Sequence, residues 1–198
     1  MGVLASLLRL ARESVSEADL SMRPHLEVLP KPQKEFWDEL IGTVPAHFVL
    51  YGGTAVALWF GHRKSVDFDF FSDQGLEFDQ LLATMPSLKE ATALDRKSDT
   101  VTVSMPMSSG EVKLSFFGGI SFGRVGDPDR VQGKVRVASL LDLLATKLKT
   151  IHDRIEAKDY LDSEVLLKSG LTLSQGIAAA RSLFGQTLNP LDTAKAVG

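Results

Sequence analysis

The clearest alternation of apolar and polar residues along the chain lies at residues 65–71. One set of alternate positions is apolar: Val66, Phe68 and Phe70. The other set carries two carboxylates and then a ring: Asp67, Asp69 and Phe71. A period of two residues is typical of a β-strand, because successive side chains point to opposite faces of a sheet. The segment therefore predicts a strand with one face in the core and one face that bears both aspartates.

Other short segments have the β-prone, apolar content of strands and end at turn residues. They lie at residues 47–51, 100–105, 112–117 and 134–137, with a turn at 108–110 and irregular chain at 118–126. In the last of these strands Lys134 and Arg136 alternate with two valines. This pattern predicts an edge strand with a basic exposed face.

Apolar residues recur at helical spacing elsewhere, which predicts helices at 35–41, 54–60, 78–85 and 173–184. Ser139 is the expected N-cap of a longer helix. The apolar stripe of that helix is Leu144, Leu148, Ile151 and Ile155. Helical pattern resumes through residue 167 and stops at Gly170.

The order of these elements predicts an α+β fold, with a small mixed sheet flanked by helices and a helical C-terminal part. We expect three parts along the chain. Residues 1–29 form an N-terminal helical extension, 30–138 form the core sheet, and 139–198 form a helical part that packs on the core.

The composition of the chain excludes several kinds of functional site. The chain has 198 residues, a net charge of -3 and no cysteine. The absence of cysteine excludes disulfide frameworks, thiolate nucleophiles and cysteine-based metal sites, so a reducing cytoplasm is the expected setting. No apolar segment approaches the roughly 20 residues that span a bilayer, and we expect no membrane partner. A nucleic-acid partner would need a local basic patch.

Two local patterns suggest phosphate chemistry. Gly52 and Gly53 lie between a predicted strand and a predicted helix, where backbone N–H groups can approach a phosphate closely. Taken alone, a glycine pair is more often a simple turn. Asp67 and Asp69 share a strand face with Cα atoms roughly 6.6 to 7 Å apart, which suits ligation of Mg²⁺ or Mn²⁺. The alternative is a solvated strand face.

Together these segments resemble the AbiEii/AbiGii-type nucleotidyltransferase toxins, in order from about residue 29 to residue 185. The matching segments are 52–55 (Gly-Gly-Thr-Ala), 61–63 (Gly-His-Arg), 65–71 (Ser-Val-Asp-Phe-Asp-Phe-Phe), 112–118 (Val-Lys-Leu-Ser-Phe-Phe-Gly), 142–147 (Asp-Leu-Leu-Ala-Thr-Lys) and 158–162 (Lys-Asp-Tyr-Leu-Asp). The resemblance implies a nucleotidyltransferase fold, a nucleoside triphosphate as substrate and a divalent metal ion.

The resemblance also assigns roles residue by residue. It implies phosphate contacts from Gly52, Gly53 and Thr54, and metal ligation by Asp67 and Asp69. It further implies nucleotide or catalytic roles for Lys113, Asp142 and Lys147. Residues expected near the site are Arg63, Lys158, Asp159 and Asp162.

The chain departs from the wider superfamily at Ser115, where a third carboxylate is expected. Ser115 shares a strand face with Lys113, so both side chains can still meet a nucleotide. A third carboxylate would have to come from elsewhere. Asp142 is the better candidate, and Glu111 has the right parity but lies near a turn.

The remaining charged residues have both functional and structural interpretations. Lys147, Arg154 and Lys158 follow i, i+7, i+11 spacing and form a basic edge, which would meet a triphosphate or RNA, or simply be solvated. Asp159 and Asp162 share a helix face and would serve a metal or pair with a cation. Arg63 would either neutralise phosphate or fix the strand of Asp67 by an ion pair.

The expected function is magnesium-dependent transfer of a nucleoside monophosphate to an acceptor, either tRNA or other RNA or a protein. The resemblance adds a toxin role with a cognate antitoxin. The alternative is a nucleotide-binding or interaction protein that kept the fold and lost turnover. A third option is adenylylation of a sugar or antibiotic, for which a closed acceptor pocket would be expected beside the metal site.

Overall fold

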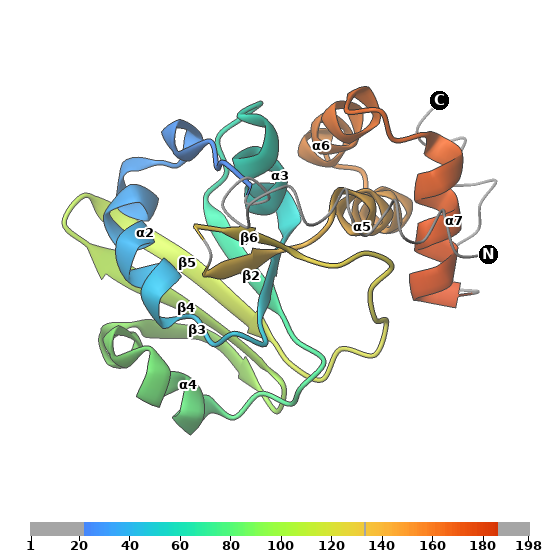
Figure 1. The fold of residues 1–198 in the computed structure, drawn as a ribbon. Helices are drawn as coiled ribbons and strands as arrows, with labels where there is room; N and C mark the ends of the chain where they lie inside the picture. Colours follow the sequence, from blue (N-terminus) through green and yellow to red (C-terminus); the bar gives the residue numbers. More distant parts are fainter. Residues whose placement is uncertain (1–21, 133, 186–198) are drawn as a thin grey trace, which may run out of the picture.

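The computed structural model describes residues 22–132 and 134–185, which form one mixed sheet with helices packed against it (Figure 1). The seven strands lie in the order β3-β4-β5-β2-β1-β7-β6. Their bounds are β1 (Val49–Tyr51), β2 (Asp67–Phe71), β3 (Thr92–Lys97), β4 (Thr100–Met107), β5 (Gly110–Phe117), β6 (Asp129–Val131) and β7 (Val135–Val137). Since β2 pairs parallel with β5 and antiparallel with β1, the sheet is mixed, and the α+β prediction is confirmed.

Some helices pack on the sheet, and the C-terminal helices form a group beside it. Their bounds are η1 (Leu26–Val28), α2 (Lys31–Thr43), α3 (Gly52–Phe60), α4 (Phe78–Thr84), η2 (Pro86–Glu90), α5 (Leu140–Asp153), α6 (Ala157–Lys168) and α7 (Leu173–Phe184). Helix α2 packs on β4 and β5, and α3 packs on β1 and β2. Helices α5, α6 and α7 form a group beside α3, away from β3 and β4 (Figure 1).

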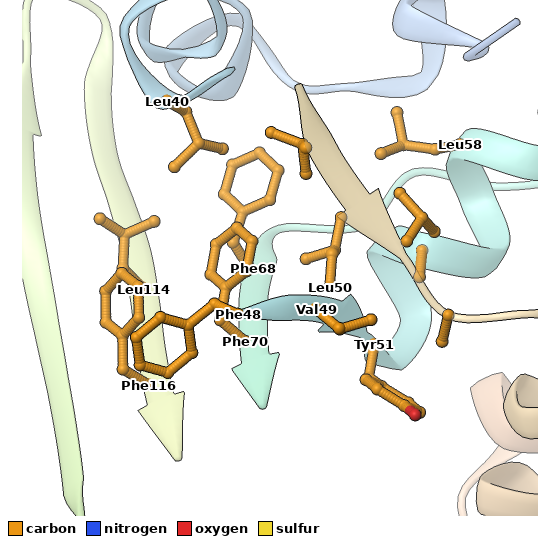
Figure 2. Packing of buried hydrophobic residues seen from close by; sticks show 14 of the residues in the cluster. Leu40, Phe48, Val49, Leu50, Tyr51, Leu58, Phe68, Phe70, Leu114 and Phe116 are labelled. Atoms are coloured by element: carbon orange, nitrogen blue, oxygen red, sulfur yellow. The ribbon is translucent and has the colours of Figure 1, made fainter. Parts of the chain in front are cut away.

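Strand β2 divides its side chains between the core and the opposite face, as its alternation predicts. Phe68 and Phe70 are fully buried, and Phe70 stacks on Phe116 of β5 with ring centroids 5.3 Å apart. Figure 2 shows these rings among the aliphatic side chains of the core. Val66 does not belong to this set, because the strand begins at Asp67 and Val66 is 56% exposed. The face that remains carries Asp67 and Asp69.

The helix expected through Ile155 ends earlier, and the helical pattern that resumes after it is a separate helix. Helix α5 ends at Asp153, α6 begins at Ala157, and Ile155 is 87% exposed rather than part of the core. In one continuous helix Asp159 would lie about 18 Å along the axis from Lys147, twelve residues earlier. The break lets α6 fold back, so that Lys147 Nζ donates to Asp159 Oδ1 at 2.9 Å.

The prediction of an edge strand at residues 134–137 is wrong. Strand β7 pairs parallel with β1 on one side and antiparallel with β6 on the other. Strand β6 was missed because Asp129–Val131 is too short to show alternation. Strand β3 at the other edge was also missed, because all its residues are exposed and no apolar face marks it.

The other predicted elements are present close to the predicted positions. Ser139 caps α5 as expected, since its Oγ accepts a hydrogen bond from the Asp142 N–H. Of the expected N-terminal extension, residues 1–21 lie outside the described residues, as do residues 186–198 of the C-terminal part. Across the described ranges, no helix has both the length and the apolar character that crossing a bilayer requires.

Candidate active site

The turn from β1 into α3 brings the backbone against a carboxylate. Gly52 has φ +72°, a conformation that side-chain-bearing residues rarely adopt, and a Cβ there would lie 2.8 Å from Asp69 Oδ2. A Cβ on Gly53 would lie 2.3 Å from Arg63 Nη2. The conformation of Gly52 therefore favours glycine strongly, whereas a side chain at Gly53 would have to displace the end of Arg63. The start of α3 lies directly beside Asp69.

Strands β2 and β5 align the polar residues in pairs. The parallel register matches Asp67 with Lys113 and Asp69 with Ser115, so the four side chains share one sheet face. Lys113 Nζ lies 3.8 Å from Asp67 Oδ2. Ser115 is buried and also receives a hydrogen bond from Thr102 at 3.3 Å. The sequence prediction that Lys113 and Ser115 share a face is confirmed.

The carboxylate pair carries charge that its surroundings compensate only in part. Burial raises the pKa of Asp69 above its ordinary value, and the charge of Asp67 raises it further. A hydrogen bond from Ser115 and the charges of Lys113 and Lys147 oppose this rise. A site that resists a second negative charge in this way favours a bound cation.

These groups line a cavity of about 640 Å³, which is within the range of roughly 300–1,000 Å³ typical of small-molecule sites. Predicted site residues that line it are Gly52, Gly53, Arg63, Asp67, Asp69, Lys113, Ser115, Lys147 and Lys158. Arg154, the third member of the predicted basic edge, also lines it. The structure therefore brings most of the predicted site together.

Asp159 and Asp162 lie beneath this cavity as counter-ions rather than in its wall. Both are fully buried. Lys147 Nζ contacts Asp159 Oδ1 at 2.9 Å and Asp162 Oδ2 at 2.7 Å. Asp159 also accepts from Arg154 Nε at 3.2 Å. The two aspartates thus fix the cations that face the cavity.

Asp162 is the centre of this charged cluster. It accepts two hydrogen bonds from Arg63, from Nε at 2.6 Å and from Nη2 at 2.7 Å, and His62 Nε2 lies 2.8 Å away. Burial by itself would raise the pKa of Asp162, but the hydrogen bonds from His62 and Arg63 and the charge of Lys147 hold it well below its usual value. The partner of Arg63 is thus on α6, not on the strand of Asp67.

Asp142 and Thr54 lie outside the cavity lining. The Asp142 carboxylate accepts from the N–H groups of Val125 and Gly126 and from the Ser139 hydroxyl. It therefore ties the loop after β5 to the start of α5. Thr54 donates to the Asp67 carbonyl and contacts the Ser65 hydroxyl at 2.9 Å, which joins α3 to β2.

The expected third carboxylate does not reach Asp67 and Asp69. Within residues 22–132 and 134–185, no group of three or more histidine, aspartate or glutamate side chains is arranged to hold a metal ion. Glu111 is exposed and accepts from Ser104 at 2.7 Å. The two carboxylates still fit Mg²⁺, since this ion is commonly held by one or two carboxylates together with substrate phosphates and water.

Sequence reasoning missed part of the cavity lining. The missed residues are Tyr51, Lys64, Ser65, Val66, Phe71, Thr102, Phe117, Phe122, Thr146, Lys149, Thr150 and Phe184. Two of them carry a signal in the sequence: Phe71 has the parity of Asp67 and Asp69, and Phe117 has the parity of Ser115. Phe122 and Phe184 come from a loop and from α7, and no local pattern marks them.

Comparisons with solved structures support this fold. JHP933 of Helicobacter pylori superposes with a TM-score of 0.59 at 18% identity, covering 84% of this chain and 87% of that one. MenT4, a nucleotidyltransferase toxin of Mycobacterium tuberculosis, gives a TM-score of 0.53 at 14% identity. That match covers 89% of this chain and 63% of MenT4. At these identities the likeness shows a shared nucleotidyltransferase fold.

A search of curated proteins gives no match. The model of the family described as the nucleotidyl transferase AbiEii toxins of type IV toxin–antitoxin systems matches residues 40–195, which is more than half of the chain. That range contains the glycine turn, both aspartates and the charged cluster of α5 and α6. The chain therefore belongs to the AbiEii nucleotidyltransferase toxin family.

Proposed function

We propose that this protein is a magnesium-dependent nucleotidyltransferase that moves a nucleoside monophosphate from a nucleoside triphosphate to an acceptor and releases pyrophosphate. The observation that carries the proposal is the contact between the Gly52 turn and Asp69, with Asp67 in the same cavity. This contact puts a phosphate-binding backbone and a pair of metal-ligating carboxylates side by side.

The phosphates of the substrate have several groups to bind. Free N–H groups at the start of α3 and the positive end of its dipole favour negative charge beside Gly52 and Gly53. Lys113 approaches from β5, and Lys147 lies in the wall formed by α5. These groups hold the β- and γ-phosphates and stabilise the charge that develops on pyrophosphate as it leaves.

Asp67 and Asp69 are the ligands for Mg²⁺, or for Mn²⁺ in its place. Bound there, the ion supplies Lewis-acid stabilisation of the phosphate oxygens during transfer. Ser115 donates a hydrogen bond to Asp69, which orients that carboxylate and opposes the rise in its pKa. Asp162 holds Arg63 and Lys147 at fixed positions beneath the site.

The acceptor that we favour is an RNA, with a tRNA end as the specific candidate. Besides Lys113 and Lys147, further basic residues line the cavity: Lys64, Lys149, Arg154 and Lys158. With a net charge of -3, the chain has no global attraction for RNA, so a short end held by a local patch fits better than a long footprint. Membership in a type IV toxin–antitoxin family makes a cognate antitoxin the expected protein partner.

The test is transfer of label from each α-labelled triphosphate onto total RNA and onto the protein itself, in the presence of Mg²⁺. We expect label on RNA, and its loss in the double variant Asp67→Ala/Asp69→Ala. Asp95→Ala on exposed strand β3 is the matched control and should keep full transfer, because Asp95 lies on the sheet edge and pairs with exposed Lys97, outside the cavity. Transfer that survives the double variant would contradict the proposal.

A second candidate function is nucleotide binding without turnover. The observation that favours it is the register of β2 and β5, in which Ser115 lies beside Asp69 where a third carboxylate would be expected. In that case calorimetry would detect triphosphate binding that depends on Asp67 and Asp69, while no acceptor would take label. Transfer of label by the wild-type protein therefore separates the two candidates.

A further inference from the structure

The cavity face of the sheet changes from charged to aromatic along its two central strands. On β2 the order is Asp67, Asp69, Phe71, and on β5 the matching residues are Lys113, Ser115 and Phe117. Phe71 and Phe117 are in register, and their rings stack with centroids 4.6 Å apart at 22°. On each strand the phenylalanine comes two residues after Asp69 or Ser115, which is a Cα separation of roughly 6.6 to 6.8 Å.

A third ring extends this surface. Phe122, from the loop after β5, lies 6.2 Å from Phe71 and 6.5 Å from Tyr51, measured between ring centroids. All of these residues line the same cavity as the two aspartates. We call Phe71, Phe117 and Phe122 the aromatic wall.

The aromatic wall is distinct from the aromatic residues of the core. Phe70 and Phe116 also stack in register, but they point to the other face and are fully buried (Figure 2). The three wall residues are only partly buried. Partly exposed rings beside charged groups in a cavity are typical of a site that binds a planar ligand.

The order of chemical groups along the strands matches the order of groups in a nucleotide. Lys113 and the segment of Arg63 and Lys64 lie at the Asp67 end, where the terminal phosphates are expected. The carboxylates follow, where the α-phosphate reacts. The rings come last, one strand step further, where the base would lie after the sugar.

We propose that the aromatic wall binds the base of the donor nucleoside triphosphate by stacking, an inference that rests on the proposed function. Stacking on aromatic side chains requires only a planar π-face and water exclusion, so the wall contributes affinity for every base. The wall acts on the nucleoside part of the substrate and leaves the phosphate contacts at Gly52 and Lys113 unchanged.

The test compares ligands with and without a base by calorimetry on the full chain in Mg²⁺. The ligands are the four triphosphates, ribose 5-triphosphate and inorganic tripolyphosphate. The variants are Phe122→Leu and Phe117→Leu, which keep apolar volume and remove the ring, and Phe122→Tyr, which keeps the ring. Phe78→Leu is the matched control, because Phe78 lies on α4 under Arg96, outside this cavity.

We expect both leucine variants to bind triphosphates about tenfold more weakly and to bind tripolyphosphate as the wild type does. Phe122→Tyr and Phe78→Leu should match the wild type. If a leucine variant fails to fold, the wild type alone still tests the inference, since ribose 5-triphosphate should bind about tenfold more weakly than a nucleoside triphosphate.

Two results would overturn the inference. Triphosphate binding that is unchanged in the leucine variants and equal to that of ribose 5-triphosphate would refute the aromatic wall and leave the proposed function intact. Failure of the wild type to bind any triphosphate or tripolyphosphate would overturn both.

Discussion

Asp162 offers the sharpest test of how the site is held together. The change Asp162→Asn keeps the size of the side chain and removes its charge. In the folded protein this carboxylate contacts Arg63, Lys147 and His62, and it is fully buried. The variant therefore leaves buried cations with fewer counter-ions while it changes packing very little.

The structure sets the expected magnitude. Removing one partner from a buried ion pair costs about 3 to 5 kcal/mol. The lower end applies here, because Lys147 keeps Asp159 and the Arg63 side chain is 18% exposed. We expect a loss of about 3 kcal/mol in the free energy of unfolding, which corresponds to a fall in Tm of about 6 to 12 °C for a chain of this size.

The assay is urea denaturation at pH 7 and at several lower values, followed by circular dichroism. Because the folded pKa of Asp162 is depressed, its stabilisation is fully present above the ordinary aspartate pKa of about 3.9 and is lost as the pH falls further. The difference between wild type and variant should therefore shrink below about pH 4. Asp153→Asn is the control, since Asp153 forms an exposed pair with Lys149 worth at most about 1 kcal/mol.

A loss below about 1 kcal/mol at pH 7 would contradict this prediction, because removal of the central anion from a buried charge cluster destabilises the fold by about 3 to 5 kcal/mol. A large loss that stays constant down to pH 3 would refute its electrostatic part. In that case the amide would disturb packing or hydrogen bonding rather than leave cations unpaired.

Three further outcomes follow from single residues. Gly52→Ala should lower the free energy of unfolding by about 1 to 3 kcal/mol and weaken triphosphate binding, because Gly52 has a positive φ and its position contacts Asp69. Gly42→Ala is the control and should not destabilise the protein, because the space around Gly42 is open. Ser115→Ala removes a hydrogen bond that lowers the pKa of Asp69, so the carboxylate should protonate at a higher pH than in the wild type. As the pH is lowered, the variant should therefore lose affinity for the Mg²⁺-triphosphate at a higher pH than the wild type, and a loss at a lower pH would contradict this. Tyr51→Phe should leave stability equal or up to about 1 kcal/mol higher in urea, because the buried hydroxyl has no hydrogen-bond partner in the described part of the chain, and a clear loss would show that it does.

The sequence was informative wherever a local period reports a local structure. The alternation around Asp67 and Asp69 predicted strand β2 and its two faces, and the glycine pair predicted the turn against it. Parity on a strand also placed Lys113 and Ser115 on one face. In each case the prediction concerns residues that are close in the sequence. Pairing of neighbouring strands in register keeps their side chains on the expected sheet face.

Relations set by tertiary contacts could not be foreseen in this way. The break between α5 and α6 brings Asp159 to Lys147, and helical spacing along the sequence does not report this contact. The family resemblance implied a site role for Asp142, yet its carboxylate accepts hydrogen bonds from the N–H groups of Val125 and Gly126. Phe122 reaches the cavity because the loop after β5 places its ring 6.2 Å from the ring of Phe71.

The charges around the cavity divide into two groups with different roles. Lys147 and Arg63 face the cavity, and both are paired with Asp162, which balances part of their charge and fixes their positions. Lys113 lies 3.8 Å from Asp67 and is half exposed, so its charge is the less committed one. A cation bound by Asp67 and Asp69 would replace Lys113 as the counter-ion of Asp67. Lys113 would then be free to contact a phosphate. The substrate and the metal ion would therefore bind cooperatively, because each relieves a charge that the other leaves unpaired.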